Sequence, residues 1–382
     1  MARFLLASLC LILGIGVCRS LEFNGHNPYF FEDSVFLWNV TLESSEQAVE
    51  FFQQHISVYG ELTAPGAERD ICFYYKLPMA LFTGGAWREA NAVMDFIKLN
   101  FLQEDGDLRT SPELKTSSFA LNEYYPYTNG WVLIAALRME RFDIVRPMYA
   151  YMKKYFDGFP TNGPTEDGNT NTDMFSAAHF GLVSLYMNDM KTAKKAAQTI
   201  LKILRKQPDL DDGMYLRMTG DGQLITEFDA GMAGFYVVNK TAEYQLHFME
   251  GYPALFLIRL YEATNNDCYM DAAKAIISWA RECNSQMYQF HYTHKLGVAM
   301  SLLYRYTEDR DLLLDIDRVA ALLKISQNAD GTYLSYDDNS YADIYDQSAE
   351  IAVWMRAMDA NDYYKIDIND EATKPVTPLT PP

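Results

Sequence analysis

Two kinds of helical segment alternate through most of the chain, from about residue 43 to residue 360. One kind has apolar residues at three- and four-residue steps and charge on the opposite face, which is typical of a helix with one side in water. The other kind carries little charge and many small or aromatic residues, as expected of a helix covered on both sides. Six such pairs predict an all-α fold in which the bland helices form an inner ring inside the charged ones.

The pairs can be placed along the sequence. We expect the charged helices at residues 44–60, 88–103, 142–156, 190–206, 270–284 and 310–326. We expect the bland helices at residues 70–84, 128–139, 172–187, 243–263, 290–306 and 341–358. An open solenoid of hairpins would show the same alternation. A closed ring is favoured, because six pairs is the number at which such rings usually close and the sequence ends soon after the sixth.

The 382 residues divide into one large domain and three short flanking segments. Residues 1–20 have a basic Arg3, a short apolar run and small residues near Ser20, which predicts a secretory signal peptide. A lead-in at residues 21–42, the helical ring at 43–362 and a disordered Pro/Thr-rich tail at 363–382 would follow. The sequons at Asn39 and Asn239 are candidate glycosylation sites. We therefore expect a protein that is secreted or resides in the secretory-pathway lumen.

Charge and cysteine content narrow the range of partners. A net charge of −19 argues against nucleic acid or an anionic membrane as the partner. No segment after the signal is long and apolar enough to span a bilayer. Three cysteines remain after the signal, Cys72, Cys268 and Cys283, and they are expected to be small buried hydrophobic residues rather than a disulfide framework. No group of cysteines and histidines has zinc spacing, so the sequence predicts neither a metal nor a cofactor.

The connections between helices indicate where a site would lie. Long links run from charged to bland helices at residues 104–127, 157–171, 207–240 and 327–340, whereas the links back, such as 140–141, are minimal. All long links therefore fall on one rim, at the amino ends of the inner helices. Functional residues are concentrated on long loops carried by a rigid scaffold. Within 207–240, two alternating runs flank a Gly-Asp-Gly and predict a β-hairpin flap.

Aromatic and ionisable residues gather at that rim. Aromatic rings with a polar tip suit a small neutral substrate that needs both stacking and hydrogen bonds. The expected substrate-binding residues are Tyr74, Tyr75, Tyr127, Trp131, Tyr244 and Tyr345. Asp173 and Asp346 lie early in inner helices three repeats apart, and a facing pair of carboxylates suits glycoside hydrolysis. His247 and His291, on adjacent inner helices, would instead suit proton transfer in an epimerase or lyase.

In its architecture the chain resembles the (α/α)6 toroid enzymes. These include the six-hairpin glycosidases and sugar epimerases and the squalene-cyclase-like proteins. Residues 252–275 are similar to their helix, turn and outer-helix units, and residues 103–106 and 327–331 are similar to the Gln...Asp-Gly turns of the cyclase repeats, without the Trp that should follow. Residues 209–212, Asp-Leu-Asp-Asp, match the DxDD motif of class II terpene cyclases. That resemblance would make Asp211 the catalytic acid, although Gly213 and the flap context favour a solvated turn.

Three hypotheses follow. The first is a secreted, metal-independent carbohydrate-active hydrolase or epimerase that uses the aspartates or histidines as acid and base. The second is a cyclase, isomerase or dehydratase that acts on an isoprenoid or similar apolar substrate. The third is a non-catalytic module that binds a ligand through its aromatic residues. The sequence leaves the oligomeric state open.

Overall fold

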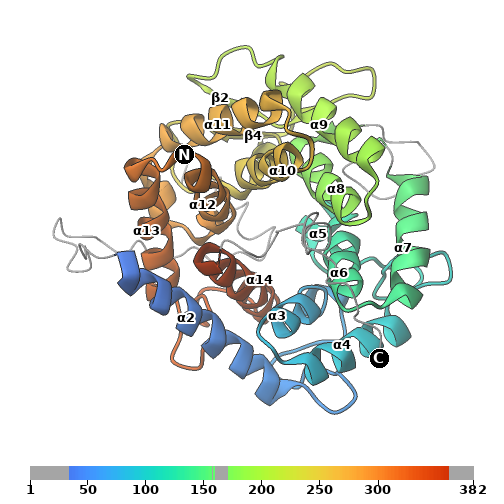
Figure 1. Cartoon of the computed structure of the whole chain (residues 1–382). Helices are drawn as coiled ribbons and strands as arrows, with labels where there is room; N and C mark the ends of the chain where they lie inside the picture. The colour runs from blue at the N-terminus through green and yellow to red at the C-terminus, as the bar shows by residue number, and fades with distance from the viewer. Residues whose placement is uncertain (1–33, 157, 160–170, 361–382) are drawn as a thin grey trace, which may run out of the picture.

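The computed structural model describes residues 34–156, 158–159 and 171–360, and the side chains of residues 41–358 within them. The expected signal peptide, most of the lead-in and the tail lie outside the described residues. Twelve long or medium helices form two concentric rings (Figure 1). The chain therefore has the predicted all-α (α/α)6 toroid fold.

Outer and inner helices alternate along the chain. The outer ring consists of α2 (Ser34–His55), α4 (Trp87–Asn100), α7 (Phe142–Tyr155), α9 (Met190–Leu204), α11 (Asp267–Arg281) and α13 (Arg310–Ile325). The inner ring consists of α3 (Leu77–Thr83), α6 (Tyr127–Arg138), α8 (Met174–Tyr186), α10 (Phe248–Thr264), α12 (His294–Thr307) and α14 (Tyr341–Ala360). The connections contain five shorter helical segments. They are α5 (Phe119–Glu123), η1 (Ile71–Phe73), η2 (Ala230–Phe235), η3 (Ser285–Gln289) and η4 (His291–Thr293).

The inner ring is closed. Each inner helix contacts the next one, and α14 contacts both α3 and the first outer helix, α2. The Ser45 hydroxyl of α2 donates a hydrogen bond of 2.7 Å to the Ala352 carbonyl of α14, which joins the two ends of the described chain. The bland composition of the inner helices follows from this arrangement, since every residue of α8 from Met174 to Leu185 is buried. No helix in the described part of the chain combines the length and apolarity that a membrane span requires.

The short turns from inner to outer helices share one backbone conformation. A residue with positive φ follows each inner helix from α3 to α12, and this left-handed residue ends the helix. These residues are Gly85 at 83°, Glu140 at 57°, Asn188 at 55°, Asn265 at 52° and Glu308 at 53°. Because each turn reverses the chain within a few residues, these connections place no large loop on the opposite rim within the described part of the chain.

Several of the longer connections open with a small hairpin. Isolated antiparallel bridges join Ile56 to Leu62, Leu102 to Leu108 and Gln327 to Tyr333. The glycine inside each hairpin has positive φ and packs on the backbone of a neighbouring outer helix, as Gly106 does on Pro147 and Gly331 on Gln47. The Gln-to-Gly turns at 103–106 and 327–331 are therefore contacts between repeats.

The flap between α9 and α10 has more pairing than the sequence suggests. The expected hairpin is present as a bridge between Met218 and Leu224. In addition, β3 (Arg217–Met218) pairs with β1 (Thr172–Asp173), and β2 (Gly213–Tyr215) pairs with β4 (Val237–Asn239), both antiparallel. The first pairing ties the flap to the start of inner helix α8.

Candidate active site

A pocket opens into the centre of the ring at the amino ends of the inner helices. Its walls are mainly aromatic and apolar, and its charged residues come from η1, α12 and α14 or their immediate flanks. The lining residues are Cys72, Tyr75, Lys76, Ser118, Ala120, Leu121, Tyr124, Tyr127, Phe175, Phe235, Leu246, Phe248, Tyr292, Lys295, Ala342, Asp343, Asp346, Gln347 and Glu350. The pocket therefore lies on the rim that the long connections predicted.

Glu350 is the centre of the charged group. Its carboxylate is fully buried and lies 2.5 Å from the Lys76 ammonium and 2.8 Å from the Lys295 ammonium. The Tyr127 hydroxyl and the Trp354 indole N–H donate to the same carboxylate at 3.1 and 2.9 Å. Burial alone would raise the pKa of Glu350, but Lys295 and Lys76 hold it well below the usual range. Glu350 is therefore ionised and fixes both lysines.

Lys76 bridges two carboxylates of α14. Besides Glu350, its ammonium contacts Asp346 Oδ2 at 2.7 Å. Burial would lower the pKa of Lys76, but the two carboxylates raise it, so this lysine stays charged. Burial and the nearby Glu350 raise the pKa of Asp346, while Lys76 opposes that shift.

Lys295 is less firmly held in its charged form. Glu350 is its carboxylate partner, and the Lys295 ammonium also lies 3.1 Å from His294 Nε2. Burial and the charge of Lys76 lower the pKa of Lys295 to about 8, against the opposing effect of Glu350. Burial lowers the pKa of His294 to about 4, so this imidazole is neutral at pH 7. Lys295 can thus lose or gain a proton close to physiological pH.

Asp343 lies one helical turn before Asp346 on the pocket wall. Its carboxylate accepts a hydrogen bond of 2.7 Å from the Ser340 hydroxyl. Burial raises the pKa of Asp343 to about 7, and the charge of Asp346 adds to the shift. A carboxyl group that titrates near neutral pH is suited to act as a general acid or base.

Several polar atoms of the pocket have no partner within the described part of the chain. They are the Tyr75 hydroxyl, Asp346 Oδ1 and Gln347 Oε1. The Tyr75 hydroxyl and the Asp346 carboxylate are neighbours, since burial and this carboxylate raise the pKa of Tyr75. Buried polar groups in proteins are nearly always hydrogen-bonded. A ligand with hydroxyl groups could donate hydrogen bonds to Asp346 Oδ1 and Gln347 Oε1 and could form another with the Tyr75 hydroxyl.

Below the charged group, aromatic rings fill the inner ring. Tyr252 makes edge-to-face contacts with Tyr127, Phe175, His179 and Trp354. His179 is fully surrounded, and burial lowers its pKa to about 3, so its ring is neutral. The aromatic layer seals the floor of the pocket and lowers the local polarity around Glu350.

The structure brings only some of the sequence-predicted residues together. Tyr75, Tyr127 and Asp346 line the pocket, and Trp131 lies behind it, with its ring centre 5.8 Å from the Lys76 ammonium. Tyr74 instead stacks on Phe96 of α4, and Tyr345 packs on Phe51 of α2. Both of those rings lie between the inner and outer layers.

Asp173 does not line the pocket opposite Asp346. It caps α8 by accepting a hydrogen bond of 2.6 Å from the Ser176 N–H, and it is the cross-strand neighbour of Arg217. Burial raises the pKa of Asp173, and Arg217 counteracts this shift. Arg217 is itself buried, with its guanidinium carbon 4.3 Å from the centre of the Tyr236 ring. The position of Asp173 is that of a structural cap.

The two predicted histidines are also outside the pocket lining. His247 contacts Glu250 on the next turn, with 3.1 Å between Nδ1 and Oε1. The His291 carbonyl accepts a hydrogen bond from His294, and burial lowers the pKa of His291 to about 3. Tyr244 is half-buried and lies against Phe290.

The residues of the terpene-cyclase-like motif and the sequons lie elsewhere. The Asp211 side chain is 93% exposed and forms a surface ion pair with Lys240. Its surroundings are those of a solvated surface turn and not of an enclosed catalytic pocket. Asn239 is exposed at the end of β4, whereas the side chain of Asn39 is outside the described residues.

The sequence interpretation missed Lys76, Lys295 and Glu350, which form the charged centre. The sequence does contain a sign of these three residues. Each is a charged residue in a segment whose other residues are mostly small, apolar or aromatic, as in a helix covered on both sides. Charged residues are almost never fully buried unless they are paired. A charged residue in an otherwise apolar inner helix therefore predicts an oppositely charged partner on another inner helix.

Comparison with known proteins supports the fold. No protein-family model and no curated protein sequence matches the chain. Among solved structures, a D-mannose isomerase has a TM-score of 0.58 and 15% identity over 84% of this chain and 97% of its own. A GH76 α-mannanase of Bacteroides thetaiotaomicron has a TM-score of 0.55 and 12% identity over 84% and 96% of the two chains. A sugar epimerase from a ruminal bacterium has a TM-score of 0.55 and 11% identity over 84% and 99%. The chain shares the six-hairpin (α/α)6 fold of these carbohydrate-active enzymes.

Proposed function

We propose that this protein is a secreted sugar isomerase or epimerase that moves a proton at the carbon next to the carbonyl group of an open-chain sugar. The observation that carries the proposal is the pair of buried ammonium groups, Lys76 and Lys295, held by Glu350 at the end of an aromatic pocket next to Asp343. Structural neighbours that are named as a mannose isomerase and a sugar epimerase are in keeping with it.

The charge distribution suits this chemistry. When a base removes the proton from the carbon next to a carbonyl, the electron pair moves onto the carbonyl oxygen and gives an enediolate. Fixed cations aimed at the developing oxyanion lower the barrier, and removing one such donor typically costs about 10²–10³ in kcat. Asp343, whose pKa is raised to about 7, serves as the base, and Lys76 and Lys295 stabilise the oxyanion. If the proton is returned to the former carbonyl carbon C1 while the hydroxyl proton moves from O2 to O1, the product is the isomer with its carbonyl at C2. If it is returned to C2 on the opposite face, the product is the epimer.

The pocket also has the groups that a sugar requires. The flat faces of Tyr75, Phe175 and Phe248 can cover the C–H surfaces of a sugar, while the unpartnered oxygens of Asp346 and Gln347 can accept hydrogen bonds from its hydroxyls. A substrate with hydroxyl groups fits these atoms better than an isoprenoid, which would leave them unpaired.

A hydrolase is less well supported. Glycoside hydrolysis normally uses two carboxylates on opposite sides of the bond that is cleaved. The three carboxylates that line this pocket, Asp343, Asp346 and Glu350, all come from α14. One α-1,6-mannanase with this fold is described in an inactive form in which two consecutive aspartates are replaced. In the present chain neither consecutive pair, at residues 211–212 and 337–338, lines the pocket.

Isotope exchange tests the proposal directly. The purified protein is incubated in D₂O with mannose, glucose, fructose and their N-acetylamino relatives, and proton NMR follows the C2 proton of the aldoses and the C1 protons of fructose. We expect deuterium to enter at C2 of at least one sugar, and Lys295→Met to slow that exchange about 10²–10³-fold. Lys240→Met, outside the pocket lining and in an ion pair with the exposed Glu282, is the matched control and should exchange at the rate of the unmodified protein. Release of new reducing ends from α-1,6-mannotetraose without exchange would replace the proposal by a hydrolase, and binding without either reaction would favour a binding module.

A further inference from the structure

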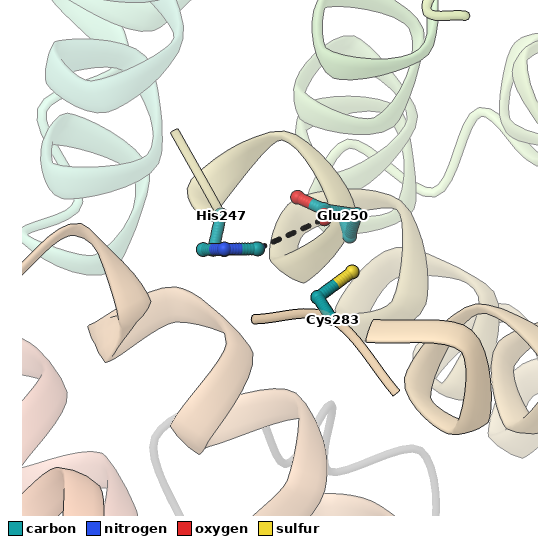
Figure 2. A group of neighbouring side chains, drawn as sticks. All are labelled: His247, Glu250 and Cys283. Carbon is teal, nitrogen blue, oxygen red and sulfur yellow. Dashed lines mark hydrogen bonds and ion pairs between the residues drawn. The ribbon is translucent and has the colours of Figure 1, made fainter. Parts of the chain in front are cut away.

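Outside the pocket, three side chains of metal-binding type converge on one point. His247, Glu250 and Cys283 each offer one ligand atom, and these atoms lie within 4.8 Å of one another. Figure 2 shows the Cys283 sulfur directed toward Glu250, whose carboxylate is joined to His247 by the dashed line. His247 and Glu250 come from the start of inner helix α10, and Cys283 follows the end of outer helix α11. None of the three lines the pocket.

The three side chains are buried, and one oxygen of Glu250 lacks a hydrogen-bond partner among the described residues. Their exposed fractions are 2% for His247, 0% for Glu250 and 8% for Cys283. Glu250 Oε1 contacts His247, but Oε2 has no hydrogen-bond partner in the described part of the chain. A buried carboxylate oxygen without a partner is costly, and the cost is larger for a charged group than for a neutral one. A cation at this point would remove that cost.

We propose that His247, Glu250 and Cys283 bind one divalent metal ion, with zinc the best match, and that water completes the coordination. Nitrogen, oxygen and sulfur together are the ligands that zinc accepts. Zinc-to-ligand distances of 2.0–2.3 Å place tetrahedral ligand atoms about 3.5 Å apart, so side-chain movements of about 1 Å complete the site. On binding, the Cys283 thiol releases its proton to solvent and exchanges its weak 3.6 Å contact to the Trp279 carbonyl for a bond to the metal.

Charge balance favours this composition. The two positive charges of the ion are matched by one thiolate and one carboxylate, with a neutral imidazole as the third ligand. The complete site is therefore neutral, as a buried site requires. No sequence motif indicates this site, because the ligands come from two segments more than 30 residues apart and lack the short spacing of zinc motifs.

The ion would connect the two rings of the toroid. It would tie the first turn of α10 to the end of α11 on the rim where the pocket opens. Phe248, which lines the pocket, lies between two of the ligands in sequence. The metal would thus fix one pocket wall from behind, without contact with the substrate. The inference does not depend on the reaction proposed above.

Cobalt substitution gives the most specific test. The full-length protein is stripped with a chelator, loaded with Co²⁺ and desalted, and its metal content and near-ultraviolet spectrum are measured. We expect about one ion per chain and a thiolate-to-cobalt charge-transfer band, since Cys283 is a ligand. Cys283→Ser should remove the band, and Glu250→Gln should weaken binding at least tenfold. Cys268→Ser is the matched control, because Cys268 is exposed and lies at the start of α11, the outer helix that Cys283 follows.

A second measurement uses the unmodified protein and does not depend on the variants folding. Alkylation of each cysteine is followed by mass spectrometry with and without Zn²⁺. We expect zinc to slow the alkylation of Cys283 about tenfold and to leave that of exposed Cys268 unchanged. Equal alkylation of Cys283 in both samples, or a charge-transfer band that persists in Cys283→Ser, would overturn the proposal.

Discussion

Replacing Glu350 by Gln tests the charged centre most severely. The amide keeps an oxygen for the Tyr127 and Trp354 donors, but it removes the negative charge between Lys76 and Lys295. Lys76 retains Asp346, whereas Lys295 loses the carboxylate 2.8 Å away. Leaving a buried charge uncompensated typically costs about 3–5 kcal/mol. We expect a loss of this size in the free energy of unfolding, measured by urea denaturation at pH 7.

The loss should depend on pH in a defined way. The pKa of Lys295 is lowered to about 8 in the folded protein, below its value in the unfolded chain. Above pH 8 the folded protein therefore carries a neutral Lys295 and no longer needs Glu350 to balance it, so the difference between the two proteins should shrink. The difference in unfolding free energy between the two proteins should also shrink in acid. Folding lowers the pKa of Glu350, so the stability that the Glu350 carboxylate contributes is lost as the pH falls through its folded pKa.

A substitution in an exposed ion pair distinguishes the loss of a buried charge pair from the general effect of removing one carboxylate. Glu282 pairs with Lys240 at 2.8 Å, but its side chain is 61% exposed. Exposed ion pairs contribute about 0–1 kcal/mol, so Glu282→Gln should be nearly neutral at every pH. If Glu350→Gln costs less than about 1 kcal/mol at pH 7, or if its cost is the same at pH 7 and pH 9.5, the reasoning about Lys295 is refuted.

Three further outcomes are expected. Asp343→Asn should lower kcat/KM about 10²–10⁴-fold and remove the limb near pH 7 from the pH–rate profile. Because the folded pKa of Asp343 is raised from 3.8 to about 7, the unmodified protein should lose stability between those values as the pH rises, and the variant should lack this loss. Gly331→Ala should lower stability by about 2–4 kcal/mol, since φ is 93° and the new Cβ would overlap the Gln47 backbone. Gly158→Ala, where the described residues place no atom within 4 Å of the new Cβ, should change stability little in a paired thermal melt. Asn239→Gln should abolish a glycan-sized mass on protein secreted from eukaryotic cells, and an unchanged mass would remove this sequon from the glycosylation sites.

The architecture was predictable because it depends on periodicity, which the sequence displays directly. The outer helices begin and end within a few residues of their expected bounds, except that α2 begins at Ser34, ten residues before the expected start at Ser44. The rim of the site was also predictable, because it follows from which connections are long. Both predictions depend on the pattern of many residues, so an error in placing one residue changes them little.

The site itself was predictable only in part, because helix phase is decided one residue at a time. Tyr74 and Tyr75 are neighbours, yet one ring lies against the outer helix and the other lines the pocket. Tyr345 and Asp346 differ in the same way, since one residue is a rotation of about 100°. The contact between Lys76 and Glu350 spans 274 positions and depends on ring closure, which no local pattern encodes.

Ring closure has a consequence for how the protein is made. Glu350, which neutralises both lysines, lies on the last inner helix, and that helix packs on the first outer one. While a ribosome is still producing the chain, Lys76 and Lys295 have no such carboxylate to accompany them into the interior, and burying them alone would be unfavourable. We therefore expect that the charged centre cannot assemble until α14 is available, and that a chain truncated before α14 keeps an open, hydrated interior that proteases can enter.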